Sequence, residues 1–260
     1  MDTMTTSPSA AAPVRSLSTA DLDWALRSGW DDFKAKRGDL ILLPFIYAAV
    51  GLLAAWFAFN QALFPLIFPL VGGFALVGPL AAAGFYELAR RCESGEDSSW
   101  WHFLDPIKGP SRLPMMALTG MLALLFLGWM VVANALYGAT LGTLAPATPA
   151  EFVRDLFGTS QGWTMIIVGN LVGAIIATLT LAVAAFSFPM VVDRRGGDAT
   201  SAVATSVAAF RRNPGVMIGW GLRVAGILVL AALPLFVGLM VALPLLGYAT
   251  WHLYTRAVQR

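Results

Sequence analysis

Charged residues are scarce in this sequence of 260 residues: Asp, Glu, Lys and Arg make up 12% of it, whereas hydrophobic residues make up 58%. Soluble globular domains carry about 25% charged residues. The composition therefore indicates an integral membrane protein, for which lipid is the main solvent. The net charge of +2 at pH 7 is too small to provide a clustered basic face, so no nucleic-acid partner is expected.

Cysteines and familiar catalytic motifs are also lacking. The single cysteine, Cys92, excludes an intramolecular disulfide and a cysteine-based metal site. The sequence contains no HExxH, no GxSxG, no Walker lysine loop and no GxGxxG that opens a helix after a strand. We therefore expect a protein that is not an enzyme, with no catalytic residues, no metal and no cofactor.

Long apolar runs are abundant. Residues 40–86 contain no charged side chain, which is roughly twice the ~20 residues that one helix needs to cross a bilayer. The same length argument, with turns at polar residues, Gly and Pro, predicts six spans at about residues 40–59, 63–86, 113–144, 163–192, 215–233 and 235–254. The last two could instead form a re-entrant pair that does not fully cross.

The chain before the first span has two parts. Residues 1–16 are polar, rich in Pro and Ala and lack an apolar core, which predicts a disordered cytoplasmic tail; residues 17–260 form one membrane domain. Ser18 and Asp21 can form a capping box that starts an amphipathic helix. Its predicted apolar face comprises Leu22, Leu26, Trp30 and Phe33, and its polar face Arg27, Asp31, Lys34 and Arg37. This helix packs on the bundle or contacts lipid.

The surface helix recurs along the sequence. Aligning Phe33 with Phe210 superimposes residues 21–41 on 198–218, DATSAVATSVAAFRRNPGVMI, including the glycine before each span. A degraded copy in residues 87–112 places Trp100, Phe103 and Ile107 on one face. The predicted fold is therefore an all-α membrane protein of three hairpins, each preceded by an amphipathic cytoplasmic surface helix.

The distribution of Lys and Arg predicts the orientation. Fifteen of the 17 basic residues lie in the N-terminal region, in the loops 87–112 and 193–214 or at the C-terminus, whereas Arg154 alone lies on the opposite side. Because basic residues favour the cytoplasmic side, both termini are predicted to be cytoplasmic.

Arg223 is the one charge clearly inside a predicted span, which makes it a candidate contact for a ligand or a lipid phosphate. Alternatively, it snorkels to the inner headgroups or pairs with Glu87 or Asp193. Asn134 and Asn170 are further possible ligand contacts, although they can also bridge helices. Gly169, Gly173 and Ala177 form a GxxxG-type face that predicts close helix packing.

Several stretches together resemble a family of bacterial integral membrane proteins, a domain of unknown function. They are DLDWALRSGWDDFKA, GFALVGPLAAAGFYELARR, SFPMVVDR, NPGVMIGWGLR and LPLLGYATWHLY, and they extend from about residue 16 to the end. The resemblance implies six helices, a multi-pass location in the inner membrane and no established activity. Some relatives carry a cytochrome c oxidase label, but two histidines cannot supply the ligands for two haems and copper.

These observations favour a non-catalytic accessory or assembly component of a membrane complex. Its expected partners are the lipid bilayer and other membrane-protein subunits or a second copy. The alternative is a transporter or lipid-handling protein with a cytoplasm-facing cavity around Arg223, lined by helices kinked at Pro79, Pro189 and Pro244. A third hypothesis, a haem or metal enzyme, requires His102 and His252 to meet.

Overall fold

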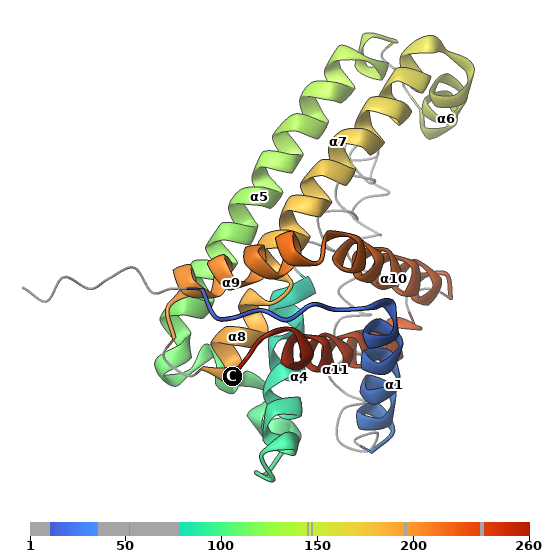
Figure 1. Cartoon of the computed structure of the whole chain (residues 1–260). Helices are drawn as coiled ribbons and strands as arrows, with labels where there is room; N and C mark the ends of the chain where they lie inside the picture. The colour runs from blue at the N-terminus through green and yellow to red at the C-terminus, as the bar shows by residue number, and fades with distance from the viewer. Residues whose placement is uncertain are drawn as a thin grey trace, which may run out of the picture. The chain divides into compact units, whose positions relative to one another are not determined.

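The computed structural model describes residues 11–35, 52, 78–144, 146, 148–194, 197–234 and 237–260, and within these ranges its elements are helical (Figure 1). The α-helices are α1 (Thr19–Ala35), α4 (Gly78–Glu93), α5 (Arg112–Ala139), α6 (Pro149–Gly158), α7 (Ser160–Ala184), α8 (Ser187–Asp193), α9 (Ala199–Arg212), α10 (Pro214–Ala232) and α11 (Leu239–Ala257). The 3-10 helices are η2 (Trp100–Ile107), η3 (Gly109–Ser111) and η4 (Leu141–Leu144). The all-helical prediction is confirmed for this part of the chain.

Three stretches among the described residues are long and apolar enough to cross a membrane: Gly109–Ala139, Ser160–Asp193 and Pro214–Ala232. They correspond to the predicted spans 113–144, 163–192 and 215–233. The predicted span 40–59 and most of the span 63–86 lie outside the described residues. The predicted span 235–254 corresponds to α11, which is not among the three and has 12 of its 19 residues buried by protein.

The chain forms two compact units. Of the described residues, the first unit holds α1, α4, η2, η3, the start of α5, the end of α7, α8, α9, α10 and α11. The second holds the remainder of α5, η4, α6 and most of α7.

Helix α11 forms the core of the first unit. Its Tyr248, Trp251 and Tyr254 are at most 1% exposed, and α1 lies along it. The two backbones meet at Gly29, where an added Cβ would lie 2.6 Å from the backbone nitrogen of Ala249. Such an approach is possible only because neither residue has a large side chain.

This contact corrects the predicted orientation of the first surface helix. The helix and the pairing of Ser18 with Asp21 are confirmed, since both the backbone nitrogen and the hydroxyl of Ser18 donate to Asp21 at 2.8 Å. The buried residues of α1, however, are Leu22, Ala25 and Gly29, and the side chain of Trp30 is 43% exposed. Small residues face α11 because the two helices pack closely. A prediction based on apolar periodicity does not take residue size into account.

The N-terminal segment also differs from the prediction of a disordered tail over residues 1–16. Residues 1–10 lie outside the described residues, but residues 11–16 are held in place. Val14 bridges Val258 in antiparallel fashion, and the backbone nitrogen of Ala12 donates to Thr205 Oγ1 at 2.9 Å. The side chain of Asn213 accepts from the backbone of Leu17 at 2.7 Å and extends this attachment. Composition alone does not reveal these partners, which lie some 200 residues away.

The other two surface segments have different forms. Helix α9 is a regular helix capped by Asp198, whose side chain accepts from the backbone nitrogen of Ser201. The degraded copy is instead the 3-10 helix η2, in which Phe103 is buried and Ile107 is 48% exposed. Three residues per turn align Phe103 with Pro106 rather than with Ile107, so the predicted shared face is wrong.

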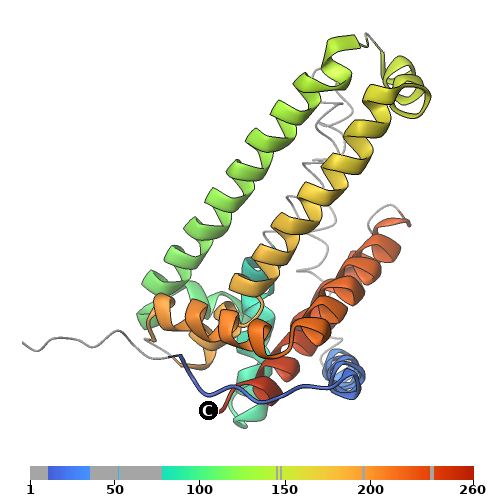
Figure 2. The same ribbon diagram turned by 45° about the horizontal axis from the view of Figure 1, so that its top comes forward.

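In the second unit, α5 and α7 run antiparallel and α6 lies at their connected ends (Figure 2). Added Cβ atoms at Gly169 and Gly173 of α7 would each lie 3.4 Å from a side chain of α5, Leu136 in the first case and Trp129 in the second. The residue numbers of these contacts rise along α7 and fall along α5, as is expected for antiparallel helices. The third residue of the predicted packing face, Ala177, is exposed.

Candidate functional site

Glu87, near the middle of α4, is a buried carboxylate, only 2% exposed. It accepts hydrogen bonds from Arg90 Nε and Nη2, both at 3.0 Å, and from Arg91 Nε at 2.7 Å. The three residues lie three and four positions apart, so a single helix brings both guanidinium groups to the acid. These charge-assisted bonds offset the cost of burying the carboxylate.

Further charges extend this arrangement to the following loop and to η2. Arg91 Nη2 donates to Asp105 Oδ2 at 2.9 Å, and the same oxygen lies 2.7 Å from His102 Nδ1. Arg90 forms a second pair with Glu96 at 2.9 Å. The hydrogen bond to Glu87 raises the pKa of Arg90, so this guanidinium remains charged. We call this set the Glu87 cluster: Glu87, Arg90, Arg91, Glu96, His102 and Asp105.

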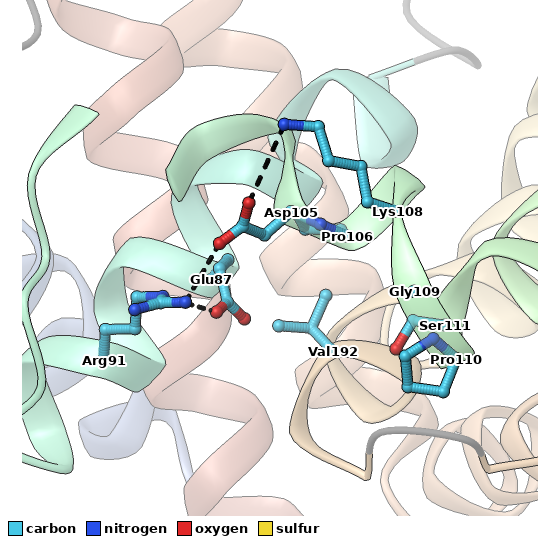
Figure 3. A pocket seen from close by; sticks show the side chains of 9 residues that line it. All are labelled: Glu87, Arg91, Asp105, Pro106, Lys108, Gly109, Pro110, Ser111 and Val192. Atoms are coloured by element: carbon cyan, nitrogen blue, oxygen red, sulfur yellow. Dashed lines mark hydrogen bonds and ion pairs between the residues drawn. The ribbon is translucent and has the colours of Figure 1, made fainter. Parts of the chain in front are cut away.

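A cavity of about 190 Å³ adjoins the Glu87 cluster (Figure 3). Its lining residues are Glu87, Arg91, Asp105, Pro106, Lys108, Gly109, Pro110, Ser111 and Val192. The carboxylates of Glu87 and Asp105 face Arg91, and Lys108 Nζ lies 4.0 Å from Asp105. The cavity is smaller than the roughly 300 Å³ at which ligand pockets usually begin, and its charges already neutralise one another. These features favour a structural role for the Glu87 cluster, which joins α4 to η2.

Arg223 of α10 is likewise paired within the protein. Its Nη1 lies 2.8 Å from Asp23 Oδ1 of α1, and the two side chains are 33% and 52% exposed. The contact is an ion pair without hydrogen-bond alignment, because the same Nη1 has no hydrogen-bond partner. The predicted partners, Glu87 and Asp193, are wrong: Arg90 and Arg91 bind the former, and Tyr254 donates to the latter at 2.9 Å.

The two histidines bind different carboxylates. His102 lies beside Asp105 in η2, whereas His252 Nε2 of α11 lies 2.7 Å from Asp32 Oδ2 of α1. Among the described residues, no group of three or more His, Cys, Asp and Glu side chains could hold a metal ion. The pairing of His252 with Asp32 instead joins α11 to α1.

The two asparagines predicted as ligand contacts are exposed on α5 and α7. Asn170 Nδ2 donates to the carbonyl of Ile166 one turn earlier, at 2.7 Å. This backbone bond partly satisfies the amide within its own helix.

Of the three prolines proposed to kink helices, Pro244 lies inside α11, whereas Pro189 lies in the first turn of α8, where the missing N–H costs no helical bond.

The Glu87 cluster is the feature that sequence reasoning missed. From the sequence, Glu87 is predicted only as a partner for Arg223, at the start of the loop 87–112. An acid followed by two arginines at the third and fourth positions of a helix was a sufficient signal. The corresponding acid in VVDRR, Asp193, binds Tyr254 and Arg260 instead, so the two similar motifs have different partners.

Residues 67–193 match the model of a family described as "Predicted integral membrane protein (DUF2189)". No match was found among curated proteins or solved structures. The resemblance to an integral membrane protein family of unknown function is therefore confirmed over these residues, which make up just under half of the chain.

Proposed function

We propose that this integral membrane protein is a non-catalytic component that assembles with other membrane proteins or with itself in the bacterial inner membrane. We further propose that it crosses the membrane six times, as three hairpins with cytoplasmic termini. The lengths of the apolar runs and the distribution of Lys and Arg support this topology.

One observation carries the proposal: the candidate spans leave most of their surface uncovered. In an apolar stretch of 18 residues within each span, buried residues make up only 22% in the α5 span, 17% in the α10 span and 11% in the span that includes α7. On α7, a stripe of four apolar residues at every fourth position is between 52% and 64% exposed: Ile167, Leu171, Ile175 and Leu179. Lipid or another helix must cover such a face, and in this proposal a helix of a second subunit or of a second copy covers it.

The described charges favour assembly over transport. A transporter needs polar groups available to a substrate near its spans. Arg223 is already paired with Asp23, and the Glu87 cluster is neutralised internally. If Arg223 nevertheless binds a ligand, Arg223→Leu will abolish that binding without lowering expression, and this result would favour the transporter hypothesis.

Affinity purification in mild detergent tests the proposal. We expect the wild-type chain to bring down a second membrane subunit or a differently tagged copy of itself. Leu171→Trp should weaken this association, because a packed helix cannot accommodate the larger side chain whereas lipid can. Leu230→Trp is the matched control on α10, where Leu230 is 68% exposed. A wild-type chain that repeatedly purifies alone would contradict the proposal.

A further inference from the structure

Helix α6 forms as an independent element between two candidate spans. Thr148 and Glu151 cap it reciprocally, each side chain accepting a backbone hydrogen bond at 3.2 Å. Pro149 occupies its first turn, where a proline stabilises a helix. These local signals explain a helix of only 10 residues outside the spans.

Helix α6 has three different sides. One side packs on the protein, with the ring of Phe152 6.4 Å from that of Tyr137. A second side is apolar and uncovered, with Val153 47% and Phe157 60% exposed. The third carries Arg154, whose side chain is 73% exposed. An exposed valine and phenylalanine at adjacent turns do not stabilise a helix that is surrounded by water. The apolar side of α6 therefore suggests a non-aqueous environment.

The corner between α6 and α7 fixes where this apolar side lies. Only Thr159 separates the two helices, and its hydroxyl donates to the carbonyl of Asp155 at 2.6 Å while accepting from the backbone of Gly162 at 3.0 Å. A Cβ at Gly162 would collide with the carbonyl oxygens of Asp155 and Leu156. The α6 helix is therefore held tightly against the end of α7.

We propose that α6 is an interfacial helix that inserts Val153 and Phe157 into the boundary between lipid headgroups and acyl chains. Because α7 starts at Ser160 and is a candidate membrane span, the tight corner places α6 at the membrane surface. Trp163, 52% exposed at the start of α7, donates its indole N–H to the carbonyl of Phe157 at 3.1 Å. Tryptophan at the end of a span and a short helix with an apolar side and a charged side are both typical of the interface.

Site-directed spin labelling tests this proposal in full-length protein. Cys92→Ser removes the only native cysteine, and single nitroxide labels are then attached through Val153→Cys, Phe157→Cys or Arg154→Cys. The proteins are reconstituted in vesicles of phosphatidylethanolamine and phosphatidylglycerol. Collisions with oxygen, which concentrates in lipid, are compared with collisions with a water-soluble nickel chelate. Leu124→Cys, at a position of α5 that is 72% exposed and lies outside the α7 stripe, provides the reference for acyl-chain depth.

We expect the ratio of oxygen to nickel collisions to be several-fold higher at positions 153 and 157 than at 154, and lower than at 124. Equal nickel access at 153, 154 and 157 would overturn the proposal, because the apolar side would then face water. Protection of 153 and 157 from both reagents would also overturn it, because a second copy of the chain would then cover this side. The two apolar positions report independently, so poor folding of one variant leaves the test decisive.

Discussion

Glu87 is the charge whose neutralisation the fold should tolerate least. Glu87→Gln would leave Arg90 and Arg91 without their buried partner, so we expect a loss of roughly 3 kcal/mol in the free energy of unfolding. Glu96→Gln is the matched control, because Glu96 also binds Arg90 but is 41% exposed. There we expect a loss below about 1 kcal/mol. Unfolding of both variants in mild detergent, followed by tryptophan fluorescence, measures the difference. Similar losses in the two variants would count against a special role for the buried acid.

The capping carboxylate of Asp21 predicts a pH dependence. Hydrogen bonds from the backbone and hydroxyl of Ser18 lower the pKa of Asp21 below 3.8. A carboxylate with a lowered pKa in the folded state stabilises the fold above its unfolded pKa and loses that effect as the pH falls through the lowered value. Asp21→Ala should therefore reduce the thermal midpoint at neutral pH. The gap from the wild type should close in acid below pH 3.8. A gap that stays constant over this pH range would contradict the assignment.

Single-residue roles could be predicted from the sequence where the partner is local. Ser18 with Asp21 and Asp198 with the start of α9 are pairings within one helical turn. The partner of Arg223 was mispredicted because Asp23 lies 200 positions away and its proximity depends on how α1 packs. Local spacing therefore predicts caps, whereas partners of distant charges require the tertiary structure.

At the scale of elements, the contact between α1 and α11 depends on Gly29. Gly29→Ala introduces a Cβ 2.6 Å from a backbone atom, which cannot move as a side-chain end can. We expect a loss of about 1–3 kcal/mol in the free energy of unfolding, the usual cost of overpacking. Gly215→Ala in α10 is the control, since nothing lies within 4 Å of its added Cβ, and we expect no loss. If Gly29→Ala were as stable as Gly215→Ala, α1 and α11 would not pack as described.

The existence of most described helices was predictable, but their packed faces were not. Apolar runs and capping residues predicted helices where α1, α5, α7, α9 and α10 lie, although the predicted spans 113–144 and 163–192 run past the ends of α5 at Ala139 and α7 at Ala184. Apolar periodicity placed Trp30 rather than Gly29 on the buried side of α1, because it ranks residues by hydrophobicity and ignores how closely two backbones approach. In η2 the error came from the wrong helical period.

At the scale of the whole molecule, the single native cysteine permits a direct test of the proposed topology. Cys92 is exposed in the last turn of α4. In spheroplasts, a membrane-impermeant maleimide should label it only after the membrane is permeabilised. Arg154→Cys in a Cys92→Ser background should be labelled without permeabilisation, because the proposed topology places residue 154 on the opposite side. Labelling of both positions under the same condition would contradict the orientation inferred from the basic residues.

The molar mass of the purified protein in mild detergent tests the assembly proposal most directly. Light scattering, with the detergent contribution subtracted, should give a protein mass well above the 27.7 kDa of one chain. Leu171→Trp should shift this mass towards that of one chain, and Leu230→Trp should not. A wild-type mass of one chain, with no second protein in the preparation, would contradict the account.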